Sequence, residues 1–149
     1  MSLAVKQGKP MKTYQIAIDI AAMPQTVWQV LTKDMPAGPQ AFGIRKLEGE
    51  LTPGGRLKLW SEIDPKRAFA LQVTSMEDPQ RMVWRGGMPF GLFTGTRTFQ
   101  LSPIDVGTRF EMTERFSGPL SGLIVKSIPD LTPSFTTFAN TLKAKAETP

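Results

Sequence analysis

The sequence contains neither cysteine nor histidine. Without cysteine there is no disulfide, no thiolate nucleophile and no cysteine-ligated metal. Without histidine, the chain by itself builds no Ser-His-Asp or Cys-His catalytic arrangement and no His-ligated metal site. Acid–base chemistry would therefore depend on Asp, Glu, Lys or the single tyrosine, Tyr14. We expect no metal and no cofactor.

Long apolar runs are also missing. No stretch approaches the roughly 18 to 20 consecutive apolar residues that span a bilayer. Residues 1–10, MSLAVKQGKP, lack the hydrophobic core of a signal peptide, so we expect a cytoplasmic protein. The 149 residues are 40% apolar and 21% charged, which is typical of one globular domain. We expect a flexible segment over residues 1–11 and a single domain over residues 12–149.

Clustered basic charge is absent, although the net charge is +5. The lysines and arginines are scattered singly or in pairs, such as residues 45–46 and 66–67. No basic block is interleaved with aromatic residues, and no nucleic-acid motif is visible. The sequence therefore favours a solvated surface over a nucleic-acid interface.

The C-terminal stretch, residues 120–146, carries apolar residues spaced three and four apart. This spacing predicts a helix with one broad apolar face, and such a face needs a sheet to pack against. Pro129 lacks a backbone donor and disfavours helix at the residue before it, which predicts a bend. Thr132 and Pro133 are then expected as the N-cap and first residue of the continuing helix.

Most of the chain before this stretch is predicted to form strands. Residues 14–20 alternate between apolar and polar, and a short helix is expected to begin near Pro24 and to end in a loop at residues 35–39. Short strands follow at residues 44–51, 56–63, 69–74 and 82–84, with turns at residues 52–55, 64–66 and 77–80. Such spacing indicates an antiparallel meander. If Leu57 and Leu59 face inward, Trp60 faces outward, toward a partner or under a covering segment.

A last hairpin pairs residues 93–102 with residues 108–116. Placing Leu101 opposite Phe110 puts apolar residues on one face and polar residues on the other, and only one register does so. In that register Arg97 faces Glu114 on the apolar side. Opposite charges there should pair, because an isolated buried charge is costly. The pair would either close one end of the core or act as a polar handle in a ligand cavity.

Several motifs together resemble a known family. They are Ala-Ile-Asp-Ile-x-Ala-x-Pro-x-x-Val-Trp-x-Val-Leu-Thr at residues 17–32, Pro-Gly-Gly at 53–55, Met-Val-Trp-Arg-Gly at 82–86 and Gly-Thr-Arg-Phe at 107–110. The sequence resembles the SRPBCC (START-like, helix-grip) superfamily, most closely its polyketide cyclase/dehydrase branch. The resemblance implies an α+β helix-grip fold: a curved antiparallel sheet of about seven strands wrapped around a long C-terminal helix, with short helices near the N-terminal part and an apolar cavity inside.

Three functions are compatible with these observations. The first is binding or carriage of a hydrophobic or aromatic small molecule, lipid- or polyketide-like, between the sheet and the second half of the helix. The second is a polyketide cyclase-like enzyme in which Arg97 stabilises an oxyanion and Glu114 moves a proton. The third is a protein-partner module like the heat-shock ATPase activator branch, or a homodimer.

The cavity hypothesis names a set of ligand-binding candidates on inward-facing positions. They are Trp84, Met88, Phe90, Arg97, Phe99, Phe110, Met112, Glu114, Phe116, Phe135 and Phe138. Aromatic and methionine side chains serve equally well as ordinary core packing, so some of them are expected to fill the core instead. Residues 85–91, a glycine-rich loop between strands, and residues 35–42 are expected at the entrance.

Overall fold

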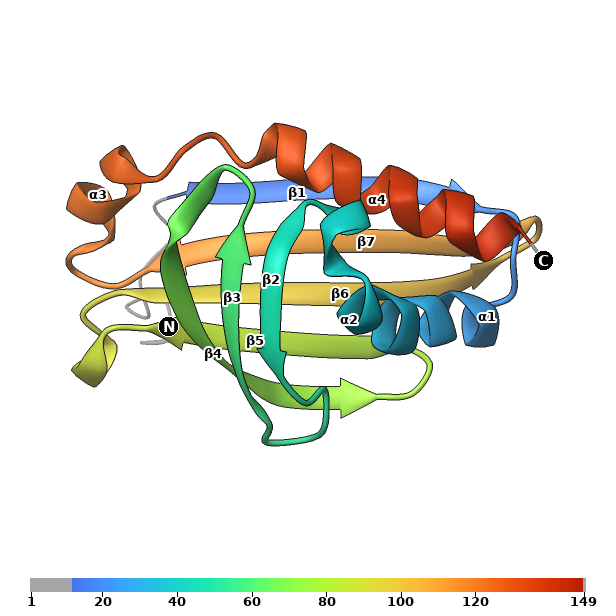
Figure 1. Cartoon of the computed structure of the whole chain (residues 1–149), viewed down its shortest axis with the longest axis horizontal. Coiled ribbons are helices and arrows are strands. Elements are labelled where there is room, and N and C mark those ends of the chain that lie inside the picture. The colour runs from blue at the N-terminus through green and yellow to red at the C-terminus, as the bar shows by residue number, and fades with distance from the viewer. Residues whose placement is uncertain (1–11, 149) are drawn as a thin grey trace, which may run out of the picture.

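The structure is a computed structural model that describes residues 12–148. One seven-stranded antiparallel sheet dominates it, in the order β1-β7-β6-β5-β4-β3-β2. Its strands are β1 (Lys12–Ile20), β2 (Ile44–Gly49), β3 (Arg56–Ser61), β4 (Asp64–Glu77), β5 (Arg81–Gly87), β6 (Thr94–Ile104) and β7 (Gly107–Ser117). The sheet curves around the C-terminal helix α4 (Thr132–Glu147), which confirms the predicted α+β helix-grip fold (Figure 1). The expectation for residues 1–11 lies outside the described residues.

The hairpin of β6 and β7 has the predicted register. Leu101 pairs with Phe110, and Arg97 pairs with Glu114. Strands β2 to β7 form a continuous meander. The first strand, β1, pairs with the last, β7, and forms the edge of the sheet opposite to β2. Each strand exposes alternate residues to opposite faces, so a single register places the whole apolar set of β7 on the concave side.

Helix α4 buries the predicted apolar stripe on the concave face of the sheet. Its buried residues are Phe135, Phe138, Ala139, Leu142 and Ala146, at the spacing of one helical face. Phe138 is central, because its ring lies 5.2 Å from that of Phe42 and 5.8 Å from that of Phe99. Full burial of an apolar side chain of this size contributes about 1.5–3 kcal/mol.

The chain is interrupted before α4, as Pro129 predicts. A short helix α3 (Ser121–Ile124) and a 3-10 turn η5 (Val125–Ser127) end at Ile128, whose backbone is extended. The predicted cap is wrong by one position, since Leu131 occupies the N-cap and Thr132 is already helical. The reason is that Asp130 supplies the capping contact, its carboxylate accepting a hydrogen bond from the backbone N–H of Thr132 at 2.9 Å.

A layer of short helices replaces the loop expected at residues 35–39. The helix α1 (Pro24–Gln29) continues through a π-helical turn η2 (Val30–Asp34) into α2 (Met35–Ala37), and a 3-10 turn η3 (Pro39–Phe42) follows. Pro39 begins η3, where no backbone donor is needed, and Pro36 follows the π-helical turn one residue before α2 ends. Met35 and Phe42 are buried beneath them, and this layer packs against α4.

The turn between β3 and β4 also lies elsewhere than predicted. Ser61 pairs with Asp64, so the chain reverses at residues 62–63, and residues 64–66 belong to β4. Trp60 is half-buried on the face opposite to the buried Leu57 and Leu59. The ammonium of Lys46 on β2 lies 5.0 Å from the centre of its ring, so a neighbouring strand partly covers this indole.

Candidate functional site

A cavity of about 380 Å³ lies between the sheet and the first half of α4. Strands β3 to β7 contribute most of its wall, and Ile124 and Ile128 from the segment before α4 also line it. The second half of α4, where the cavity was expected, has no such space. The elements α1, η2 and η3 pack against α4, and Val27, Leu31 and Met35 of this helical layer are completely buried.

Most of the predicted candidates meet at this cavity. The wall includes Trp84, Met88, Arg97, Met112, Glu114, Phe116, Phe135 and Phe138. Residues 85–91 contribute Gly86 and Gly87 beside Met88, whereas residues 35–42 contribute only Phe42. The predicted inward faces of β5, β6 and β7 therefore share one concave surface.

Three predicted candidates lie outside the cavity wall. Phe90 is 98% exposed, because the turn η4 (Pro89–Gly91) places it in the left-handed region at φ 60° and directs it away from the sheet. Phe99 and Phe110 are completely buried in the core. The ring of Phe99 lies 4.7 Å from that of Trp84, and Phe110 stacks on Phe138 at 6.1 Å.

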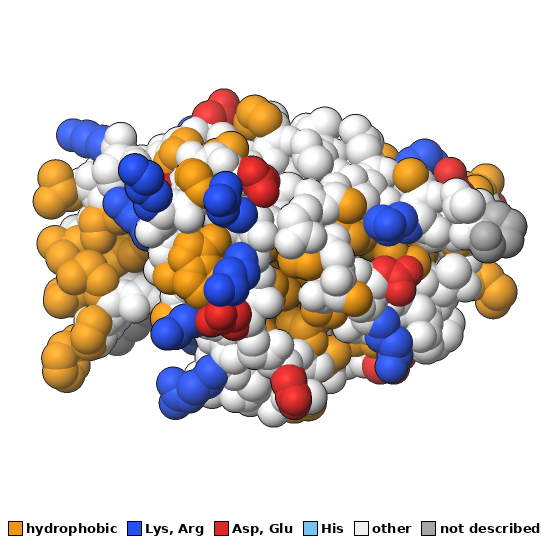
Figure 2. Space-filling view, viewed as in Figure 1, with side chains coloured by type: hydrophobic (Ala, Val, Ile, Leu, Met, Phe, Trp, Pro, Cys, Tyr) orange, Lys and Arg blue, Asp and Glu red, His pale blue; other side chains and the backbone are white. Residues whose placement is uncertain are grey.

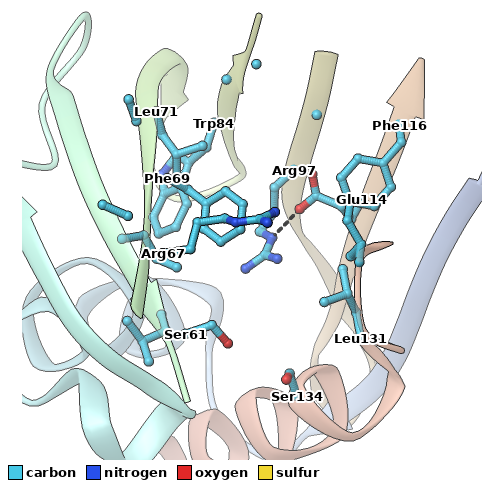
Figure 3. Close-up of a pocket in the computed structure, with 18 of the residues that line it drawn as sticks. Ser61, Arg67, Phe69, Leu71, Trp84, Arg97, Glu114, Phe116, Leu131 and Ser134 are labelled. Atoms are coloured by element: carbon cyan, nitrogen blue, oxygen red, sulfur yellow. Dashed lines mark hydrogen bonds and ion pairs between the residues drawn. The ribbon is translucent and has the colours of Figure 1, made fainter. Parts of the chain in front are cut away.

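The ion pair of Arg97 and Glu114 belongs to the wall of this cavity (Figure 3). Nε of Arg97 donates to Oε1 of Glu114 at 2.7 Å, and the two side chains are only 19% and 10% exposed. The guanidinium carbon of Arg97 also lies 5.1 Å from the ring centre of Phe135 on α4. The carboxylate and the ring together fix the guanidinium, which is the geometry of a polar group at the edge of an apolar pocket.

Arg67 is a site residue that the sequence reasoning missed. It lines the cavity from β4 and extends into it, opposite β6 and β7 (Figure 3). The sequence did contain a signal for it. The apolar residues 69, 71 and 73 share one face of the strand, and Arg67, two residues before Phe69, falls on the same face. Because a turn was predicted at residues 64–66, the strand was not expected to begin before Phe69. Ser61 on β3 and Ser134 on α4 complete the polar part of the wall.

Trp84 carries an unusual polar group for a buried side chain. It is 1% exposed, and among the residues that the structure describes its indole nitrogen has no hydrogen-bond partner. A buried donor without a partner costs about 1–3 kcal/mol. Trp84 also lines the cavity, although its indole nitrogen is itself buried.

The described part of the chain holds neither a metal-binding cluster of acids nor a membrane-spanning helix. Residues 12–148 contain no cluster of three or more Asp or Glu side chains placed to hold a metal ion. None of the helices in that range is both long and apolar enough to cross a membrane.

Comparison with solved structures shows the same fold in bacterial proteins. A protein from Mesorhizobium loti superposes with a TM-score of 0.68 at 17% identity, covering 90% of this chain and 96% of its own. A protein from Nitrosomonas europaea gives 0.66 at 17% identity, covering 89% and 92%. The protein CalU16 from Micromonospora echinospora gives 0.61 at 16% identity, covering 87% and 75%. At such identities the likeness establishes the fold alone.

The sequence comparison reaches the family level. No curated protein matches the chain. The family described as "Polyketide cyclase / dehydrase and lipid transport" matches residues 11–147, which confirms the resemblance to that branch of the SRPBCC superfamily. Because this match spans nearly the entire sequence, the chain belongs to the polyketide cyclase/dehydrase and lipid transport family.

Proposed function

We propose that this protein binds and carries a hydrophobic or aromatic small molecule in the cavity between the sheet and the first half of α4. The single observation that carries the proposal is the cavity itself, at about 380 Å³. Protein interiors are packed as densely as organic crystals and leave few voids larger than a water molecule. Pockets that bind small molecules occupy about 300–1,000 Å³ and are mostly apolar with a few placed polar groups.

The lining of the cavity supports the same class of ligand. Apolar side chains such as Phe69, Leu71 and Leu131 form most of the wall, and the polar groups gather around Arg97. The family description names polyketide chemistry and lipid transport, both of which involve largely apolar molecules. A carrier needs only this shape and chemistry, whereas an enzyme also needs a group that is free to react.

A cyclase-like enzyme is the second candidate, and the pairing of Arg97 with Glu114 inside the cavity is the observation that favours it. Arg97 would stabilise a developing oxyanion and Glu114 would move a proton. Arg97 donates to Oε1 of Glu114, so the other carboxylate oxygen of Glu114, Oε2, is the one that would take a proton from a substrate.

A partner-binding module is the third candidate. Exposed apolar side chains at one end of the molecule favour it, notably Phe90, Leu123 and Met88 (Figure 2). They come from the connection between β5 and β6 and from α3, which a backbone hydrogen bond from Leu120 to Leu92 joins. An apolar patch of this kind is typical of contact surfaces.

The test is native mass spectrometry of freshly purified protein, followed by thermal-shift measurements with lipids and aromatic metabolites. A ligand present at about 100 times its dissociation constant stabilises the folded state by about 2.7 kcal/mol, which raises the melting temperature visibly. Turnover of a polyketide substrate that disappears in Arg97→Gln would favour the cyclase. A protein without co-purified mass and without any thermal shift would favour the partner-binding module.

A further inference from the structure

The side chains that line the cavity carry more positive than negative charge. Among its lining residues, two arginines, Arg67 and Arg97, face one acid, Glu114, so the lining carries one net positive charge. Glu114 neutralises Arg97 through their hydrogen bond. The remaining charge of the lining is that of Arg67, on the opposite side of the cavity, and its nearest carboxylate is that of Asp64, 3.6 Å away and outside the lining.

The guanidinium of Arg97 is held in one orientation but still has hydrogen-bond donors without a partner among the described residues. Only its Nε atom makes a hydrogen bond with the described residues, and that bond goes to Glu114. The N–H groups on its two terminal nitrogens remain for an acceptor inside the cavity, where Figure 3 shows the guanidinium. Because Glu114 and the ring of Phe135 hold the guanidinium in place, little conformational entropy is lost when it binds an anion.

Arg67 is held more loosely than Arg97. Its Nε lies 3.6 Å from the nearest carboxylate oxygen of Asp64, which is too long for a hydrogen bond, and its side chain is 51% exposed. Its guanidinium carbon stands 5.8 Å from the ring centre of Phe69, another residue of the cavity wall. Arg67 can therefore turn toward a ligand without breaking a strong internal contact.

The polar groups of the cavity are mostly donors without acceptors. The terminal N–H groups of Arg97 and the guanidinium of Arg67 both need oxygen acceptors. A purely hydrocarbon ligand would strip water from these donors and replace none of their hydrogen bonds, which is unfavourable. A cationic ligand would add like charge to a lining that is already positive.

We propose that the occupant of this cavity is an amphipathic acid, with an apolar or aromatic body against Phe69, Leu71 and Phe135 and a carboxylate between Arg97 and Arg67. A carboxylate offers several acceptor sites in one plane and matches the fork of N–H groups on a guanidinium. Glu114 acts as the residue that positions Arg97. This inference rests on the proposed function, because it requires that the cavity holds a small molecule.

Two fluorescent probes with the same rings test the acid group directly. 8-Anilinonaphthalene-1-sulfonate carries an anionic group, and N-phenyl-1-naphthylamine is the same framework without it. We expect the wild-type protein to bind the sulfonate more tightly than the neutral amine. Arg67→Gln should weaken binding of the sulfonate about tenfold and leave the neutral amine unchanged, because a hydrogen bond to a charged group contributes about 1.5–3 kcal/mol.

Two further variants make the result specific. Glu114→Gln keeps an amide oxygen that can accept from Nε of Arg97 and removes the only negative charge from the lining, so it should tighten binding of the sulfonate, again without effect on the amine. Arg115→Gln is the matched control. It makes the same change in charge as Arg67→Gln, but Arg115 is exposed on β7 and does not line the cavity. It should alter neither affinity.

The outcomes separate this inference from the proposed function. Equal binding of both probes, or an unchanged preference in Arg67→Gln, would overturn the acidic ligand while leaving an apolar ligand intact. An equal loss of sulfonate binding in Arg115→Gln would mean that surface charge causes the preference for the sulfonate, and would also overturn the acidic ligand. Failure of both probes to bind would overturn the proposed function and the acidic ligand together.

Discussion

Arg97 and Glu114 stand directly opposite each other on β6 and β7, and Nε of Arg97 lies 2.7 Å from Oε1 of Glu114. Glu114→Ala leaves a largely buried guanidinium without its counter-ion. We expect a loss of about 3 kcal/mol in the free energy of unfolding, at the lower end of the range for buried pairs, because the cavity gives water some access. Urea titration measures it.

The double variant Arg97→Met with Glu114→Leu is the control for this pair. Replacing both charges with apolar groups of similar size should cost less than Glu114→Ala alone, since no unpaired charge remains. A loss below about 1 kcal/mol for the single variant would show that the pair behaves as a solvent-exposed one.

Substitution by alanine should have very different effects on stability at Phe138 and at Phe90. Phe138→Ala removes a ring that contacts the rings of Phe42, Phe99 and Phe110, and should cost about 3–5 kcal/mol in the free energy of unfolding. Phe90→Ala should change it by less than about 0.5 kcal/mol, because that ring is 98% exposed. Similar losses for both variants in urea titrations would contradict the assignment of Phe90 to the surface.

Ser134 offers a way to close the cavity without breaking the fold. It lines the cavity from α4, and leucine has a higher helix propensity than serine. Ser134→Leu should therefore retain the melting temperature of the unliganded protein and lose the thermal shift caused by any ligand. Asn140→Leu places the same side chain on an exposed position of α4 and should leave the ligand-induced shift in place. Retained ligand binding in Ser134→Leu would place the ligand elsewhere.

Acid should weaken two contacts near the end of β1: the ion pair of Asp19 with Arg109 on β7, and the hydrogen bonds of Glu147 at the C-terminal end of α4. The hydrogen bond from Arg109 lowers the pKa of Asp19, and the hydrogen bond from Lys143 lowers the pKa of Glu147, which also accepts from the backbone N–H of Ala21. A carboxylate with a lowered pKa in the folded state contributes stability above its unfolded pKa of about 4 and loses it as the pH falls further.

The measurement is the melting temperature between pH 7 and pH 2.5. It should be flat near neutrality and decline below about pH 4.5, as these carboxylates begin to take up protons. The variant carrying both Asp19→Asn and Glu147→Gln should start lower and decline less steeply. An unchanged slope in that variant would assign acid sensitivity to other carboxylates.

The sequence by itself determined the elements and much of their pairing. Alternation along β6 and β7 is a local pattern that one register satisfies, so the contact between Arg97 and Glu114 was predictable from residues alone. The interruption at Pro129 was equally predictable, because a missing backbone donor and a steric clash act within one turn. Helix bounds at residues 35–42 were not, since buried side chains there outweigh the prolines.

Only the tertiary structure decided where the cavity lies. Phe99 and Met112 are cross-strand partners on one face of the sheet, yet Met112 lines the cavity and Phe99 is packed solidly in the core. No local pattern separates them, because a void depends on how distant elements fill the wedge between sheet and helix. The layer from α1 to η3 packs against α4 as far as Phe138, which contacts Phe42, and the space beside Arg97 and Arg67 lies at the start of the helix, around Ser134 and Phe135.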